Sequence, residues 1–459
     1  MYLLYSLLMG LGAILLMPYW LIQGLRQGKY LANLSERLGL SIPALAKLPA
    51  GRPGANWLHA VSVGEVLAGV TLAKRLKAEF PERPLIVSTT TITGQALAKE
   101  RMPFADAVIY FPLDWAFCVR RAFAAARPAL VVVLETEIWP NFLRVASQRN
   151  VPVLFVSGRI SDRSFARSQS WLSLFGFYLR PLLQDALGRA TGFWMQSEKD
   201  AARVKALGAP PEKVRVGGNL KYDLELPKST PLADWLEGEI QRGERRPVII
   251  AGSVVATEEP LALIAFGVVQ GEFRRALLVM APRKPERFEA AAQFIEDSHQ
   301  KFVRRSSLGV ASPAGVRGNA AAGDVVDSIA SDVSVVLLDS IGELASLYRL
   351  ADGVFVGGSL VPSGGHNILE PAAFGKVPVF GEFMENFAEI AERFVTAEAA
   401  LQVASPEDAG VSWIELLRNP ERNNKMGNTA RGLVEESRGA TERAVVAVRA
   451  ALGKAETAV

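Results

Sequence analysis

Short apolar runs alternate with segments of helical periodicity in two long parts of the chain. This alternation is typical of parallel β-strands joined by right-handed helical crossovers, in which the residues that follow the strands meet at one edge of the sheet. Each part is therefore predicted to form a Rossmann-like α/β domain. The expected strands are 57–60, 85–87, 108–111, 130–134, 153–156 and 192–195 in the first part, and 248–251, 276–281, 335–338, 353–356 and 377–380 in the second.

The boundary between the two parts is predicted at a charged segment that contains two prolines, residues 224–246. With 459 residues the chain is too long for one ordinary core. We therefore expect a first domain at 26–223, a linker at 224–246 and a second domain at 247–459 that ends in helical structure. Segment 304–332 is rich in Ser, Ala and Gly and is predicted to be a flexible insertion rather than a site.

The first residues are predicted to attach the chain to a membrane. Residues 1–25 carry no charged side chain, and a helix of that length, at about 1.5 Å per residue, could cross a hydrocarbon core of roughly 30 Å. Arg26, Lys29 and Arg37 follow at once, and basic residues favour the cytoplasmic side. A cleaved signal peptide is the alternative, but the segment lacks a basic start and a small-residue cleavage site. We expect a retained anchor with the domains on the cytoplasmic side.

A second segment, residues 163–180, mixes arginines with aromatic residues at helical spacing. Such a helix could lie against anionic lipid headgroups. It could equally be a helix that faces the core and has a solvated basic edge. The pattern does not separate these two interpretations.

Composition and charge exclude several classes of protein. The 51 Lys and Arg residues nearly balance the 47 Asp and Glu residues, and no basic run with interleaved aromatics occurs, so nucleic acid is not expected as a partner. Cys118 is the single cysteine and the three histidines are scattered, which argues against a disulfide framework and a zinc cluster. We expect a protein of a reducing compartment that needs no metal and no cofactor.

Charged side chains follow strands of the first part. Glu65 falls in the opening turn of the helix after the first strand, where a carboxylate could serve catalysis or only partner the helix dipole. Glu135 and Glu137 follow the fourth strand, and Lys221 lies where the first domain ends. Because acidic groups at the mouth of a parallel sheet are seldom structural, we regard this edge as a candidate site.

Residues 353–382 carry the clearest pattern in the second part. An apolar strand is followed by a glycine-rich loop, 357–365, and by a helix expected over 366–374. Free N–H groups at a helix start and close backbone approach at glycines suit an anionic ligand, and Glu370 would suit a sugar hydroxyl. The alternative is a plain turn in which His366 is a cap and Glu370 is solvated. Arg283 follows another strand of this domain and could neutralise a phosphate.

Five motifs stand in a characteristic order behind the apolar N-terminal segment: SVGE, ETEIWPN, GNLKYD, APRKPERF and GGSLVPSGGHNILEPAAFGKVPVFG. The chain has no GxGxxG motif after its first strand, no P-loop lysine motif and no D-x-D tripeptide. Over nearly its whole length it closely resembles the 3-deoxy-D-manno-octulosonic acid (Kdo) transferases of lipopolysaccharide assembly. The resemblance implies a GT-B fold, in which two Rossmann-like domains flank a central cleft, with an acceptor-binding first domain and a second domain that binds the donor CMP-Kdo.

The resemblance also implies roles for particular residues. Glu65 matches the catalytic base of the family, and Glu135 and Lys221 match its supporting charged pair. The acceptor would be the tetraacylated, phosphorylated lipid A precursor, used at the lipid surface of the bacterial inner membrane. The donor CMP would be held by Pro282 and Arg283, by Ile341, Gly342 and Glu343, and by Asn367, Ile368, Leu369 and Glu370.

The residue types suit an inverting transfer without a divalent cation. A carboxylate would take the proton of the acceptor hydroxyl as it attacks, and cationic groups and helix N-termini would stabilise the departing monophosphate. Two other classes stay open. A related UDP-sugar transferase or UDP-sugar 2-epimerase would show competition by UDP rather than CMP, and a non-catalytic membrane-anchored scaffold would bind nucleotide poorly.

Overall fold

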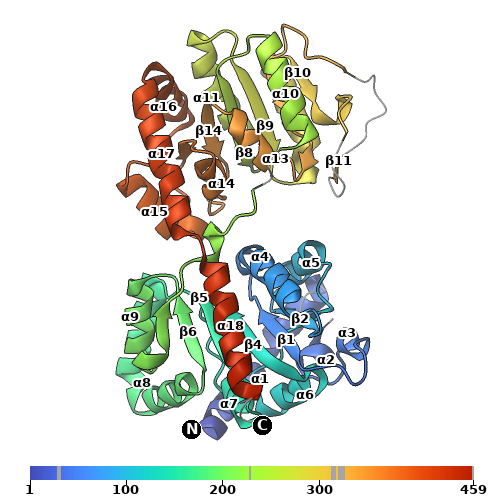
Figure 1. Ribbon diagram of the computed structural model, residues 1–459, viewed down its shortest axis with the longest axis vertical. Coiled ribbons are helices and arrows are strands. Elements are labelled where there is room, and N and C mark those ends of the chain that lie inside the picture. Colours follow the sequence, from blue (N-terminus) through green and yellow to red (C-terminus); the bar gives the residue numbers. More distant parts are fainter. Residues whose placement is uncertain (28–32, 227–228, 312–316, 319–325, 457–459) are drawn as a thin grey trace. The chain divides into compact units, whose positions relative to one another are not determined.

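The computed structural model contains two compact units, each built on a parallel sheet (Figure 1). The first unit comprises Met1–Asp223 and Ser437–Val459, and the second comprises Leu224–Glu436. The prediction of two parallel α/β domains is confirmed. The structure describes residues 1–27, 33–226, 229–311, 317–318 and 326–456, without the side chains of 18–27, 172–174, 317–318 and 454–456.

The first unit contains a seven-stranded sheet in the order β3-β2-β1-β4-β5-β6-β7, with every pair parallel. The strand order reverses between β1 and β4, and ligand groups of doubly wound folds gather at the carboxyl ends of the strands that flank such a point. The apolar pattern predicts all of these strands except the short β7. Their bounds are β1 Ala55–His59, β2 Leu85–Thr89, β3 Ala107–Tyr110, β4 Pro128–Leu134, β5 Val153–Gly158, β6 Gly192–Met195 and β7 Val214–Val216.

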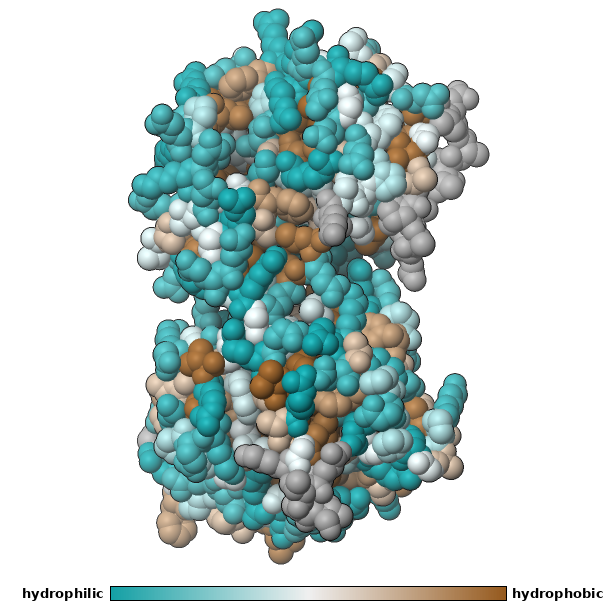
Figure 2. Space-filling view, in the orientation of Figure 1, coloured by the Kyte–Doolittle hydropathy of each residue, from teal (hydrophilic) through white to brown (hydrophobic). Residues whose placement is uncertain are grey.

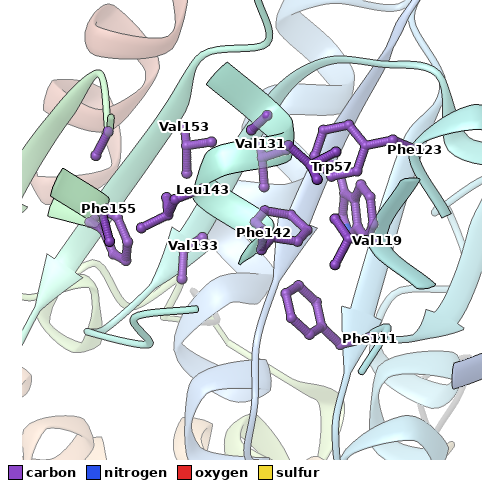
Figure 3. Close-up of a cluster of buried hydrophobic side chains, with 14 of the residues drawn as sticks. Trp57, Phe111, Val119, Phe123, Val131, Val133, Phe142, Leu143, Val153 and Phe155 are labelled. Carbon is purple, nitrogen blue, oxygen red and sulfur yellow. The ribbon is translucent and has the colours of Figure 1, made fainter. Parts of the chain in front are cut away.

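Apolar side chains pack on both faces of this sheet. On one face the ring of Trp57 lies 5.7 Å from that of Phe123 and 5.5 Å from that of Phe142 (Figure 3). On the other face α4 and α18 pack against the sheet. The helices of the unit are α1 Tyr2–Gln27, α2 Leu34–Arg37, α3 Pro43–Ala46, α4 Val63–Glu79, α5 Ile92–Arg101, α6 Ala116–Ala126, α7 Pro140–Gln148, α8 Asp162–Gly188, α9 Glu198–Ala206 and α18 Ala440–Glu456.

The second unit contains a parallel sheet in the order β10-β12-β9-β8-β14-β15-β16. Its strands are β8 Val248–Val254, β9 Leu277–Pro282, β10 Phe302–Arg304, β12 Val335–Leu337, β14 Gly353–Val356, β15 Pro378–Phe380 and β16 Leu401–Gln402, and a small antiparallel pair joins β11 Arg317–Gly318 to β13 Ser340–Ile341. Its helices are α10 Pro231–Arg242, α11 Glu259–Glu272, α12 Phe288–Asp297, α13 Leu344–Leu347, α14 Leu369–Ala373, α15 Ala388–Thr396, α16 Pro406–Arg418 and α17 Pro420–Ser437.

The units divide the chain differently from the expected domain limits in two places. The segment expected to be a linker contains helix α10, because Leu232, Leu236 and Ile240 recur every fourth residue and are buried in the second unit. Residues 437–459 were expected in the second domain, but they belong to the first unit, where Val445 and Val448 of α18 join the core.

Helix α1 contains the predicted anchor. Its first residues are held by polar contacts, since Tyr2 donates a hydrogen bond to Asp185 (2.6 Å) and Tyr5 donates one to Asp114 (3.0 Å). Leu3 and Leu7 are exposed, whereas polar residues cover most of the face of each unit seen in Figure 2. The side chains of 18–25 lie outside the described residues. In the part of the chain that the structure describes, no helix is long and apolar enough to span a membrane.

Candidate functional site

The first group of candidate residues lies where β1 and β4 end. Glu65 stands in the first turn of α4, three residues after Ser62, which caps the helix start. Ser62 Oγ accepts from the Glu65 amide (3.4 Å) and donates to Glu65 Oε1 (2.9 Å), while the Val61 amide donates to Oε2 (2.7 Å). The pattern resembles a capping box, except that the carboxylate accepts from the amide of Val61, the residue before the cap, so it does partner the helix start. The contacts also hold it in one orientation.

The surroundings of Glu65 favour its neutral form. Its side chain is only 6% exposed. Burial, followed by the negative charge of Glu135, raises the pKa of Glu65 to about 7. A carboxylate with that pKa can exchange a proton near neutral pH, which an ordinary glutamate with a pKa near 4.5 does far less effectively. Glu65 therefore has the acid–base property that a general base requires.

Glu65, Glu135 and Lys221, the three predicted catalytic residues, line one narrow pocket of the first unit. Glu135 follows β4 with a φ of 55°, a left-handed conformation that non-glycine residues adopt at a cost. Burial and Glu135 also raise the pKa of Glu137. The remaining lining residues are Ala68, Leu134, Ser157, Gln196, Asn219 and Leu220.

A polar network that the sequence analysis missed supports one wall of this pocket. Gln196 donates to the hydroxyl of Ser157 (3.2 Å), and Asn219 donates to Gln196 (2.9 Å). Asn219 in turn accepts from the amide of Lys221 (2.9 Å). Ser157 also has a positive φ, 56°. The only signal in the sequence for Gln196 is its position directly after a predicted strand.

The second group of candidate residues lies at the carboxyl edge of the sheet in the second unit. Pro282 ends β9, and Arg283 follows it with its amide bonded to the carbonyl of Val254 (2.8 Å). Ile341, Gly342 and Glu343 follow β12, while Asn367, Ile368, Leu369 and Glu370 come after β14. Because these strands are parallel and contiguous through β8, the predicted donor residues lie at one edge of one sheet.

The helix expected over 366–374 is shorter than predicted. Helix α14 begins at Leu369 and has five residues. A helix that began at His366 would place Pro371 in its interior, where proline has no N–H to donate and clashes with the preceding turn. Asn367 instead lies before the helix and accepts from the amide of Leu369 (3.1 Å). The expected anion site of a helix N-terminus is therefore reduced to loop amides and side chains.

A buried glutamate, also missed by the sequence analysis, shapes the glycine-rich loop. Glu258 accepts from the amides of Gly358 (2.6 Å), Ser359 (2.9 Å) and Leu360 (2.9 Å). Gly358 has a φ of 72°, which glycine adopts without steric cost. Glu258 precedes α11 and gives no periodic or motif signal that would distinguish it.

Electrostatic effects connect Arg283 with the residues after the glycine-rich loop. Burial, followed by the charge of Arg283, lowers the pKa of His366 to about 4. Burial raises the pKa of Glu370, which accepts from Asn367 (3.2 Å), and Arg283 partly opposes this shift. These groups offer one cation, one neutral ring and polar oxygen and nitrogen atoms to a ligand.

The carboxylate of Glu343 forms an ion pair within the protein. It is fully buried and pairs with Arg305 at 2.9 Å. The half-buried Ile341 and the exposed backbone at Gly342 are then left for the ligand role predicted at this turn. Among the described residues, no group of three His, Cys, Asp or Glu side chains is arranged to hold a metal ion.

Known proteins resemble the chain in sequence. Residues 32–224 match the family model described as 3-deoxy-D-manno-octulosonic-acid transferase. The 3-deoxy-D-manno-octulosonic acid transferase of Haemophilus influenzae is 32% identical over 423 residues, which cover 90% of both chains. The chain belongs to this family of transferases. The Bordetella pertussis enzyme of the same name is also 32% identical, over 89% of this chain and 90% of the relative.

As a member of the Kdo transferase family, the chain is a glycosyltransferase, and its fold has solved neighbours. A putative UDP-N-acetylglucosamine 2-epimerase from Listeria monocytogenes matches with a TM-score of 0.52 at 14% identity, covering 88% of this chain and 98% of that chain. This likeness shows the fold alone. It agrees with the two parallel-sheet α/β domains of the GT-B fold expected from the sequence.

Proposed function

We propose that the protein transfers Kdo from CMP-Kdo to the tetraacylated lipid A precursor in lipopolysaccharide biosynthesis, with inversion and with Glu65 as the general base. The observation that carries the proposal is that Glu65, Glu135 and Lys221 line one pocket, in which burial and the charge of Glu135 raise the pKa of Glu65. Membership of the Kdo transferase family supports the sugar that is transferred.

The proposed step is one direct displacement. The acceptor hydroxyl oxygen forms a bond to the anomeric carbon of Kdo while its proton passes to the carboxylate of Glu65. The bond between that carbon and the phosphate oxygen of CMP breaks, and CMP leaves with the electron pair. Attack from the side opposite to the leaving group inverts the anomeric centre. Glu65 then releases the proton to solvent.

Glu135 and Lys221 set the charge of the pocket in this proposal. The carboxylate of Glu135 raises the pKa of Glu65, which makes Glu65 a stronger base than an ordinary glutamate once it is ionised. Lys221 lines the same pocket and brings a positive charge that limits the repulsion between two carboxylates.

The donor residues of the second unit provide positive charge for the leaving CMP. We propose that Arg283 neutralises the phosphate and that the backbone around Gly342 and Asn367 binds the nucleotide, so that no divalent cation is needed. Activity is expected to survive treatment with EDTA. Loss of activity that added Mg²⁺ restores would contradict this part of the proposal.

A reconstituted reaction tests the function as a whole. The purified protein is incubated with lipid acceptor and with CMP-Kdo generated in place, and the product lipid is weighed by mass spectrometry. The expected result is a product heavier by whole Kdo units, with inhibition by CMP but not by UDP. Inhibition by UDP would favour the UDP-sugar class instead.

The role of Glu65 is tested separately from donor binding. Glu65→Ala is expected to reduce turnover by at least about 100-fold, since general-base catalysis typically contributes that much. CMP binding should be unchanged, because the predicted donor residues lie in the other unit. Near-normal turnover of the variant would remove Glu65 from the mechanism.

We also propose that the first unit rests on the lipid surface of the inner membrane, on its cytoplasmic side. Exposed apolar side chains gather on α1, where Leu3 is 74% exposed and Leu15 is 71% exposed, and Phe177 of α8 is 99% exposed. Such side chains can enter the interface of a bilayer, while the basic residues of α8 can meet anionic headgroups.

Vesicle binding tests this attachment. Phe177→Ser is expected to reduce co-sedimentation with vesicles that contain anionic lipid. The matched control is Val411→Ser, which changes an exposed apolar residue of the second unit. Equal binding by both variants and the unchanged protein would exclude α8 from the contact.

A further inference from the structure

Arg305 makes a buried ion pair at the predicted donor site of the second unit. Arg305 is 2% exposed, and Glu343 is fully buried. The guanidinium donates to both carboxylate oxygens of Glu343, with Nε at 2.9 Å and Nη2 at 3.1 Å. Ser340 also donates to this carboxylate (2.5 Å). The ion pair is therefore bidentate, a geometry that fixes the orientation of the carboxylate as well as neutralising its charge.

The residue after Arg305 holds the other end of the same turn. The amide of Ser306 donates to one oxygen of Asp339 (2.8 Å), and its hydroxyl donates to the other (2.6 Å). Asp339 is also fully buried. Two successive residues thus hold both ends of the 339–343 turn.

These contacts change the interpretation of segment 304–332, which the sequence predicts to be a flexible insertion. Its described beginning is built into the site, and its described strand β11 pairs with β13, in which Ser340 and Ile341 lie. Arg305 also donates to the carbonyl of Val310 (3.1 Å). Its side chain therefore ties the start of the insertion to the 339–343 turn.

The turn depends on this arginine for a physical reason. A buried carboxylate is costly unless it is paired, and an arginine fork fits a carboxylate in one orientation. Gly342 lies inside the turn with a φ of 105°, so the backbone there has little rigidity of its own. Without Arg305, the Glu343 carboxylate would be buried without a charged partner. Water would enter beside it, or the side chain would turn toward solvent and displace the Gly342 amide.

We propose that Arg305 is a positioning residue for the donor nucleotide, because its pair with Glu343 holds the 341–343 turn in the shape that binds CMP. The inference rests on the proposed function, in which this turn contacts the nucleotide. Arg305 itself does not touch the reacting atoms and is not a catalytic residue.

Nucleotide binding by the full chain tests the inference. Arg305→Ala is expected to raise the Kd for CMP and the KM for CMP-Kdo by at least about tenfold, since losing an outer-shell partner that orients a contact group costs about 10–100-fold at metal sites. The kcat at saturating donor should change less than the KM. Arg304→Ala is the matched control, because the neighbouring Arg304 makes its ion pair with the exposed Glu289 rather than with Glu343.

A second variant covers the case in which Arg305→Ala does not fold. Arg305→Lys keeps a cation beside Glu343 but loses the fork, and it is expected to bind CMP more weakly than the unchanged protein. Unchanged CMP affinity in a folded Arg305 variant would overturn the inference. Failure of the unchanged protein to bind CMP would instead overturn the proposed donor and the inference together, so the two failures are distinguishable.

Discussion

At the scale of single residues, Glu65 combines capping contacts with a raised pKa. Its contacts with Ser62 fix its position at the start of α4, and burial beside Glu135 raises its pKa. The sequence analysis left the structural and catalytic roles as alternatives. The structure shows that the capping contacts exist, and they are compatible with a base because they orient the side chain.

The pKa of Glu65 predicts the pH dependence of the reaction. A general base must be ionised to accept a proton, so kcat/KM should rise with pH and level off above a pKa near 7, because this ratio reports the groups of the free enzyme. Glu135→Gln removes a negative charge that raises this pKa, and the rising part of the curve should move to lower pH. Initial rates at substrate concentrations well below the KM, between pH 5 and 9, measure both curves. If the pH–rate curve of Glu135→Gln matched that of the unchanged protein, Glu65 would not be the group that controls the pH dependence.

The same shift predicts a stability difference. The pKa of Glu65 is about 7 in the folded state and near 4.5 in the unfolded chain, so the folded state binds the proton more tightly. Its stabilising effect is present below pH 4.5 and is lost as pH rises through 7. Glu65→Gln should therefore be more stable than the unchanged protein at pH 8, by up to about 3 kcal/mol, with a smaller difference at pH 5. Urea unfolding of both proteins at pH 8 and at pH 5 measures the difference in the free energy of unfolding.

At the scale of elements, local pattern predicted the strands and missed features that depend on distant contacts. Continuous apolar runs identify buried parallel strands, and they predicted all strands of the two sheets except the short β7, β10 and β16. Helix α10 was assigned to a linker because segment 224–246 is charged and contains two prolines, although Leu236 and Ile240 recur at helical spacing. The role of Arg305 could not be predicted, since its partner Glu343 lies 38 residues away in sequence.

The start of helix α7 is capped by a residue from another part of the chain. Trp139, which precedes it, has no side chain that can accept a hydrogen bond. Asp114 from the loop before α6 accepts instead from the amides of Asn141 (3.0 Å) and Phe142 (2.7 Å), and from Tyr5 of α1. Burial nevertheless raises the pKa of Asp114 to about 7.

Loss of this cap should be costly. Asp114→Ala leaves two buried amides without their acceptor and is expected to lower the free energy of unfolding by about 1–3 kcal/mol. Glu100→Ala, an exposed change on α5, is the control and should alter it by less than about 0.5 kcal/mol. Chemical denaturation followed by circular dichroism measures the difference. Equal effects would show that Asp114 is dispensable for α7.

At the scale of the whole molecule, the first unit is completed by the last segment of the chain. Asp223, where the long first stretch of that unit ends, accepts from the amides of Gly439 (2.6 Å) and Thr441 (2.5 Å) at the start of α18. A sequence pattern gives the helical spacing of α18 but not the unit on which its apolar face packs. Its place was therefore not predictable from periodicity alone.

Two neighbouring valines of α18 test this placement. Val445 is fully buried in the core of the first unit, whereas Val446 is 57% exposed. Val445→Ala removes two methyl groups from a packed site and is expected to destabilise that unit by about 1–3 kcal/mol. Val446→Ala should change its stability by less than about 0.5 kcal/mol, because an exposed position leaves no cavity. Hydrogen exchange, read from peptides of β4 and β5, separates the first unit from the second. If Val445→Ala instead raised exchange only in peptides of the second unit, α18 would belong to that unit. This is where the sequence analysis had placed it, within the second domain expected at 247–459.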